Sequence, residues 1–355
     1  MSNPRRLVKG TVATSEMLND YAYKCESRQE PGYFSREGGK IGFVNMIMIT
    51  LNFQSKTIQM ELNDFFKKIC DMKETARKQA YSEGRFKLMV AAFRLLFERV
   101  AKLAAVEFDK TEIKTFKGYR LCAIDGITVN LEDTCATRGY YGTLGSGEGC
   151  AAARISVAAD VLNASIILDA QIGKIKYGER ELALQHLARL LEMGMQSLLL
   201  IFDRSYASVE LFAKMKDVAF LFRLKRRFNN DIDRLPLGDH VGDFNIKGQI
   251  FRLRVAKFVL STGEIETLVT NLTSESASLK ELKELYHLRW GVETAYRGIK
   301  SLLELENFTG TSQLIIEQEF FATMYLKNMV AFSTIKINAT MISLPSDDMF
   351  CKGIL

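Results

Sequence analysis

The sequence predicts an α/β fold, in which a mixed sheet with helices on both faces follows a helical N-terminal region. Three observations support this class. Apolar residues recur at helical spacing before about residue 110, and after it strand-like segments come first and then alternate with helices. The composition, 47% hydrophobic and 25% charged over 355 residues, is that of a globular protein long enough for about two to three domains.

The N-terminal region, residues 1–115, is predicted to be helical. Residues 42–54 and 57–69 form two short helical patterns, which suit either a helix-turn-helix or a plain helical bundle. A longer amphipathic helix is expected over 86–108, with Phe93 and Phe97 on its apolar stripe. Residues 1–35 match no pattern that we can assign.

Positive charge is concentrated in the same region. Residues 1–120 hold 22 Lys and Arg against 14 Asp and Glu, whereas the rest of the chain holds 26 against 28. Such an imbalance suits a DNA-binding region joined to a neutral domain, and it also suits a basic surface without a partner.

The region 116–225 carries the predicted sheet. Its segments read in order as three strands, a helix, a strand, a helix and a strand: 119–130, 154–162, 165–175, 178–193, 197–202, 208–216 and 218–224. A meander of three strands followed by βα alternation is the order of a ribonuclease H-like mixed sheet.

A β-rich insertion is expected over 226–274, because 249–259 and 265–271 alternate around a turn. Helical patterns return at 279–306 and within 320–337, so 275–355 is expected to complete the core and to add C-terminal helices.

Several classes of protein are excluded. No apolar run reaches the roughly 18 residues that span a bilayer, and the N-terminus lacks the apolar segment of a signal peptide. The six cysteines form no C-x-x-C pair, as in a reducing cytosol. We therefore expect a cytoplasmic protein with neither a disulfide framework nor a zinc site.

Two aspartates mark the predicted sheet. Asp125 lies within the first strand, and Asp203 ends the apolar strand 197–202. If these strands are neighbours, two like charges meet at one edge, where a bound Mg²⁺ would offset their repulsion. Asp160 and Asp169 lie in the same strand region, and residue types alone do not separate the two pairs.

A third acid lies in a helical pattern. Tyr286, Arg289, Glu293, Arg297 and Lys300 fall on one face of a continuous helix. This face suits an exposed helix with ion pairs four residues apart, or a phosphate-binding surface that supplies a metal ligand. The glycine-rich stretch 138–149 lacks the P-loop order and is expected to be a loop.

The spacing Tyr-x2-Arg-x3-Glu-x6-Lys, met by Tyr286, Arg289, Glu293 and Lys300, resembles that of bacterial DDE transposases of the insertion-sequence-four family. The segments D-G-I-T-V-N-L-E-D-T and F-D-R-S-Y resemble the regions of that family's first and second catalytic aspartates. The resemblance covers about 35–310.

This resemblance implies a ribonuclease H-like core in which Asp125, Asp203 and Glu293 bind two Mg²⁺ ions, with Mn²⁺ as a substitute. It implies hydrolytic cutting at the terminal inverted repeats of the element and joining of the freed 3′ hydroxyls to target DNA, in a nucleoid-associated homodimer on double-stranded DNA. Phosphate-binding residues would be Tyr286, Arg289 and Lys300, with Arg204 and Arg297 beside them.

The residue types suit the same chemistry. In-line attack on a phosphodiester needs two metal ions about 3.5 to 4 Å apart, which three carboxylates can hold, while Arg and Lys neutralise the phosphate.

Two alternatives remain open. The chain ends 55 residues after Lys300, where relatives often continue with helices, so a DNA-binding derivative that no longer cuts is one alternative. A stand-alone ribonuclease H-like nuclease is the other.

Overall fold

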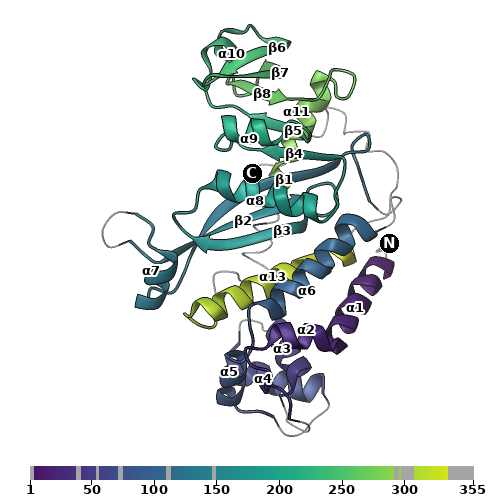
Figure 1. Ribbon diagram of the computed structural model, residues 1–355, viewed down its shortest axis with the longest axis vertical. Coiled ribbons are helices and arrows are strands. Elements are labelled where there is room, and N and C mark those ends of the chain that lie inside the picture. Colours follow the sequence, from purple (N-terminus) through teal and green to yellow (C-terminus); the bar gives the residue numbers. More distant parts are fainter. Residues whose placement is uncertain are drawn as a thin grey trace.

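The computed structural model describes residues 4–36, 41–52, 56–70, 75–108, 113–145, 149–291, 296 and 308–334. A group of helices lies at one end of the molecule, and one long sheet extends from it to the other end (Figure 1). The mixed α/β class predicted from the sequence is confirmed.

The sheet has eight strands in the order β3-β2-β1-β4-β5-β8-β7-β6. The pairs β1/β4 and β4/β5 are parallel, and the other five neighbouring pairs are antiparallel. The strands are β1 Arg120–Asn130, β2 Ala152–Asp160, β3 Ile166–Lys174, β4 Leu198–Phe202, β5 Ala219–Arg223, β6 Gly238–Ile246, β7 Gln249–Val259 and β8 Ile265–Thr270.

The first five strands were predicted to within a few residues, because each is a short apolar run bounded by turn residues. All five residues of β4 are buried, which is expected of a strand covered on both faces. β6 was not predicted, since its sequence GDHVGDFNI has few branched residues and only Phe244 and Ile246 are buried.

The segment 226–274 is β-rich, as predicted, and it continues the sheet. β8 pairs with β5 from Leu221↔Thr270 to Arg223↔Leu268, and β7 and β6 follow outward. Because this pairing joins residues about fifty positions apart, local patterns in the sequence give no sign of it.

The helical end contains α1 Pro4–Asn19, α2 Tyr21–Ser27, α3 Phe43–Leu51, α4 Ile58–Lys68, α5 Lys78–Arg85 and α6 Ala91–Lys102, which runs into a π-helical turn at Leu103–Glu107. α3 and α4 match the two predicted short helices. The prediction of one helix over 86–108 is wrong at its start, because α5 ends at Arg85 and α6 begins at Ala91. Phe86 and Met89, which lie between them, are exposed.

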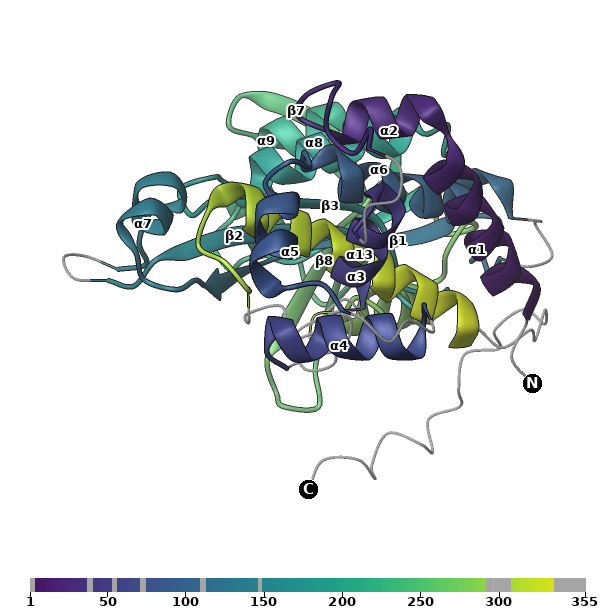
Figure 2. The same ribbon diagram turned by 90° about the horizontal axis from the view of Figure 1, so that it is seen from below.

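The last described helix, α13 Gln313–Thr334, packs against α6, α1 and β3, so it joins the N-terminal helices to the sheet (Figures 1 and 2). Its Asn328 side chain accepts a 2.8 Å hydrogen bond from the Ile167 backbone N–H and donates another of 2.8 Å to the Ile167 carbonyl. These bonds satisfy backbone groups of β3 at the edge of the sheet.

Four of the described helices lie between strands in the sequence. They are α7 Cys135–Tyr141, α8 Glu179–Glu192, α9 Val209–Lys214 and α10 Asn230–Arg234. α8 packs on β1, β2 and β3, and α7 lies on a projection at the far end of β1 and β2 (Figures 1 and 2). The prediction of a loop over 138–149 is therefore wrong for its first residues, because α7 extends to Tyr141.

The helix predicted over 279–306 is interrupted. α11 Leu279–His287 begins with a capping box between Ser278 and Glu281, and Leu288 and Arg289 form a turn after it. The calculation of helical faces assumed an unbroken helix, whereas helical residues resume only at Trp290 and Gly291. Glu306 lies outside the described residues. None of the described helices is long and apolar enough to cross a membrane.

Candidate active site

Asp125 and Asp203 lie side by side where the pairing of β1 with β4 ends. β1 and β4 are parallel neighbours, and their last paired residues are Ile124 and Phe202. The next residue on each chain is an aspartate. Since adjacent strands are about 4.8 Å apart, the two carboxylates belong to one local cluster. The condition set from the sequence, that these two strands be neighbours, is met.

The local sequence explains why the two acids remain partly hydrated. Residues 121–124 of β1 and all of β4 are completely or almost completely buried, which anchors both strands in the core. Burial decreases at Asp125, whose side chain is 20% exposed, and at Asp203, which is also only partly buried. A carboxylate at such a boundary keeps some contact with water and can bind a cation.

Asp203 receives a hydrogen bond from Tyr286. The phenol Oη of Tyr286 donates to Asp203 Oδ1 over 3.2 Å. Tyr286 lies near the end of α11, whose buried residues Leu282 and Leu285 hold that helix in the core. Burial raises the pKa of the Tyr286 phenol well above its ordinary value, so the phenol keeps its proton and acts as a donor.

Asp125 is held from two sides. Its Oδ1 accepts the backbone N–H of Gly126 over 2.9 Å, and its Oδ2 is 3.4 Å from Nη1 of Arg289. The Arg289 side chain is 8% exposed. The turn that interrupts the predicted helix carries Arg289, and this guanidinium contacts a site carboxylate.

The backbone of Asp125 is also bonded. Its carbonyl oxygen accepts hydrogen bonds from Tyr296 Oη at 2.6 Å and from Ser156 Oγ at 3.1 Å. Tyr296 is buried, and burial raises the pKa of its phenol well above the ordinary value. Two neutral hydroxyl groups therefore fix the peptide that carries Asp125.

A third carboxyl group, not expected from the sequence, lies close by. Glu266 on β8 pairs with Arg223 at 3.1 Å and is almost buried. Burial raises the pKa of Glu266, and the negative charge of Asp203 adds to this effect. With Tyr286 and the exposed Trp290, Glu266 lines a cavity of about 390 Å³. Nothing in the sequence around Glu266 marks it, since its place depends on the pairing of β8 with β5.

The other predicted site residues are less informative. Arg204 follows Asp203 and is exposed. Glu293, Arg297 and Lys300 lie outside the described residues. The structure thus brings together Asp125, Asp203, Tyr286 and Arg289, with Arg204 next to them in sequence.

The competing aspartates have different surroundings. Asp160 is fully buried against Arg120 and Asn163, and Asp169 bonds to the buried ring of His186 over 2.6 Å. Both are more buried than Asp125 and Asp203, which lie at partly exposed positions where a cation can approach.

The donor set is suitable for a hard divalent cation. Carboxylate oxygens are the ligands that Mg²⁺ and Mn²⁺ prefer, and two adjacent like charges favour a cation between them. In the part of the chain that the structure describes, no group of three or more His, Cys, Asp or Glu is placed to hold a metal ion. The third acid expected from the sequence, Glu293, is outside that part.

Comparison with known proteins agrees with this geometry. The family model of the transposase DDE domain matches residues 116–328, which include both aspartates, Tyr286, Arg289 and Glu293. The chain is also 24% identical over 277 residues to the transposase InsG for insertion sequence element IS4 of Escherichia coli (strain K12). That alignment covers 73% of this chain and 61% of the relative, so the chain spans about three fifths of its length. Two adjacent strand aspartates inside a match over more than half of the chain place this protein in the transposase DDE domain family.

Proposed function

We propose that this protein is a transposase that cuts DNA at the ends of its own element and joins the freed 3′ hydroxyls to target DNA. The observation that carries the proposal is the register of β1 and β4, which aligns Asp125 with Asp203 beside Arg289 and Tyr286. The similarity to the transposase of insertion sequence element IS4 supports the same activity.

The order of the strands supports a ribonuclease H-like catalytic core. An antiparallel meander of β3, β2 and β1, followed by parallel β4 and β5, is the arrangement expected for that fold. Within this proposal 116–225 is the first part of the core and 226–274 is an insertion. The last part of the core begins at 275.

Asp125, Asp203 and Glu293 would hold two divalent ions, Mg²⁺ or Mn²⁺. When bound, such ions activate the attacking water or hydroxyl and stabilise the leaving oxygen of the phosphodiester. The chain's own residues orient these ligands: Tyr286 donates to Asp203, while the Gly126 N–H and Arg289 hold the two oxygens of Asp125.

The DNA phosphates would contact the cationic groups at this edge. Arg289 is in place beside Asp125, and Arg204 is exposed next to Asp203. Lys300 and Arg297 are assigned the same role from the sequence. We further propose that 1–115, where basic residues are in excess, binds the terminal inverted repeats, and that a homodimer forms on the DNA.

The test is nicking and strand transfer in Mg²⁺ or Mn²⁺ on DNA that carries the terminal repeats of the element. Asp203→Ala and Glu293→Ala should abolish both reactions, whereas Glu210→Ala, at an exposed position on α9, should leave them unchanged. Activity that survives the first two substitutions would contradict the assignment.

The same experiment separates the alternatives. Binding to the repeats without cleavage in either metal would favour a DNA-binding derivative. Cleavage of RNA paired to DNA in preference to the repeats would favour a ribonuclease H-like nuclease.

A further inference from the structure

A row of three buried polar side chains lies behind the candidate active site. It runs from Ser156 on β2 through His186 on α8 to Asp169 on β3, and all three residues are buried. Ser156 Oγ is 2.9 Å from His186 Nε2, and His186 Nδ1 is 2.6 Å from Asp169 Oδ2. Burying three bonded polar groups is costly unless each is satisfied, so the row is a specific feature of the core.

The row ends on the peptide that carries Asp125. Ser156 Oγ donates to the Asp125 carbonyl, and the N–H of the same peptide, from Gly126, donates to Asp125 Oδ1. The peptide is planar, so fixing its oxygen also fixes its N–H. The direction of the Asp125 carboxylate therefore depends on the bond that Ser156 makes.

Counting hydrogens shows what His186 must do. The Ser156 hydroxyl has one hydrogen, and when it is donated to the Asp125 carbonyl, Oγ must accept from His186 Nε2–H. If Ser156 instead donated to Nε2, it would leave the Asp125 carbonyl to Tyr296 alone. The bond to Asp169 places a hydrogen between Nδ1 and Oδ2 in either case.

We propose that Ser156, His186 and Asp169 are positioning residues that hold the Asp125 carboxylate in the direction needed for metal binding. This inference rests on the proposed function. None of the three touches the DNA or the metal ions in this role: Asp169 fixes the ring of His186, His186 directs the Ser156 hydroxyl, and Ser156 holds the Asp125 peptide.

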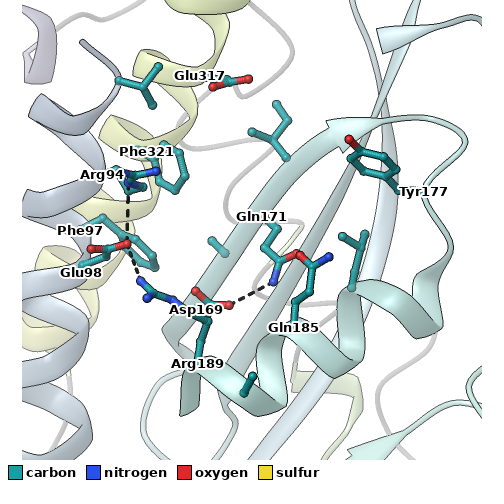
Figure 3. Close-up of a pocket in the computed structure, with 15 residues that line it drawn as sticks. Arg94, Phe97, Glu98, Asp169, Gln171, Tyr177, Gln185, Arg189, Glu317 and Phe321 are labelled. Atoms are coloured by element: carbon teal, nitrogen blue, oxygen red, sulfur yellow. Dashed lines mark hydrogen bonds and ion pairs between the residues drawn. The ribbon is translucent and has the colours of Figure 1, made fainter. Parts of the chain in front are cut away.

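The far end of the row reaches a cavity of about 700 Å³ between α6, α13, β3 and α8 (Figure 3). Asp169 lines this cavity, where Gln171 Nε2 donates to Asp169 Oδ2 over 3.3 Å. Asp169 therefore has access to water, while His186 is completely buried behind it. The cavity explains how a carboxylate can close a row whose other members lie in the core.

The first test reads the hydrogen positions directly by ¹⁵N NMR of histidine. The chain has three histidines, so variants of His240 and His287 assign the His186 signals. We expect His186 Nε2 to carry a hydrogen in the metal-free protein. An Nε2 without hydrogen would mean that Ser156 points away from Asp125, and it would overturn the proposal.

The second test measures metal binding without DNA, by EPR of free Mn²⁺, together with the Mn²⁺ concentration that gives half-maximal nicking. Loss of one hydrogen bond in Ser156→Ala should weaken Mn²⁺ binding about fivefold. His186→Asn, whose amide does not reach Ser156, should weaken Mn²⁺ binding by the same factor as Ser156→Ala. His186→Gln, whose amide nitrogen takes about the place of Nε2, should restore most of the affinity.

The double variant Ser156→Ala with His186→Asn distinguishes positioning from a loss of stability. If His186 acts through Ser156, the double variant binds Mn²⁺ no more weakly than Ser156→Ala alone. The proposal would be contradicted if the losses of Mn²⁺ affinity in the two single variants added up in the double variant, or if Ser156→Ala bound Mn²⁺ normally. Leu190→Ala, a buried change on the same helix α8, controls for lower stability and should leave Mn²⁺ affinity unchanged.

The two proposals fail in different ways. If the wild-type protein binds Mn²⁺ and shows the expected His186 signals but cuts no DNA, the proposed function is wrong, and the positioning role of Ser156, His186 and Asp169 is upheld. If the wild-type protein cuts DNA and Ser156→Ala has the same Mn²⁺ requirement, the positioning role is wrong and the proposed function is upheld.

Discussion

Asp125 and Asp160 lie on neighbouring strands of one sheet and have opposite surroundings. Asp160, at the end of β2, is fully buried and is bound by Arg120 Nε at 2.8 Å and by Asn163 Nδ2 at 2.9 Å. Asp125 is partly exposed, and its bond to Arg289 is long at 3.4 Å. The first carboxylate is enclosed in the core by its protein partners, while the second lies at a partly exposed position.

The antiparallel register explains the difference. Asp160 pairs with Cys122 near the start of β1, whereas Asp125 lies farther along that strand, where parallel β4 ends. The partner of Asp160 thus lies three residues before Asp125 on β1, in the stretch where β4 pairs along the other side of the strand. Position within a strand is therefore a weak guide to role until the pairing of strands is known.

The largest effect should follow from Asp125→Asn. Loss of a metal-binding charge should lower the nicking rate by about a thousandfold, or roughly 4 kcal/mol, because several kcal/mol of transition-state stabilisation depend on the metal site. The free energy of unfolding should change little, since Asn still fits between Gly126 and Arg289. Single-turnover nicking and thermal unfolding measure the two quantities. A large loss of stability with normal nicking would contradict this prediction, because it would give Asp125 the structural role that we assign to Asp160.

Asp160→Asn should have the opposite profile. Breaking a buried ion pair leaves Arg120 with an unmet charge, so the free energy of unfolding should fall by about 3 to 5 kcal/mol. Mn²⁺ affinity of the molecules that remain folded should be normal. Asp133→Asn, at an exposed pair with Arg138, is the matched control and should lower the free energy of unfolding far less than Asp160→Asn. Denaturant titration and Mn²⁺ binding decide between the outcomes.

Tyr286→Phe should give a smaller effect at the same edge. It removes the hydroxyl that donates to Asp203, so nicking should slow about fivefold, corresponding to about 1 kcal/mol. Tyr325→Phe removes a hydroxyl bonded to Thr14 at 2.9 Å, away from the site, and should leave nicking unchanged. Equal rates for both variants would show that Asp203 does not need its donor.

The smallest effect on the free energy of unfolding is expected at Asp239, a partly exposed carboxylate in an ion pair. Asp239 on β6 is bound by Arg254 at 2.6 Å, and this hydrogen bond lowers the pKa of Asp239 below its ordinary value of 3.8. A lowered pKa stabilises the fold above the ordinary value, and this contribution is lost as the pH falls through the lowered value.

The measurement is the difference in unfolding free energy between the wild type and Asp239→Asn. Because Asp239 is partly exposed and the buried Arg254 keeps its bonds to the Thr273 and Ala277 carbonyls, the difference should be about 0.5 kcal/mol from pH 7 to pH 5 and should shrink below about pH 4. A difference that grows as the pH falls would contradict this sign.

The strands of the core could be predicted because each is marked by the apolar pattern of its own neighbouring residues. The run S-L-L-L-I-F-D contains β4 and its aspartate, and the branched segments around it gave β1, β2, β3 and β5. β6 and α1 were not predicted, since neither carries a strong pattern of apolar residues. The unbroken helix over 279–306 was wrong at one point, because Leu288 and Arg289 form a turn between α11 and the helical residues Trp290 and Gly291, and Arg289 lies beside Asp125.

By itself, the sequence determined the α/β class, the main strands, the two aspartates at the ends of apolar runs, and the resemblance to DDE transposases. These properties depend on neighbouring residues, whose pattern of burial can be read directly. Only the tertiary structure decided which aspartates meet, that Glu266 and Arg223 lie beside them, and that His186 faces the back of the site. Such contacts join residues far apart in the chain, and their positions follow from strand pairing that no local pattern records.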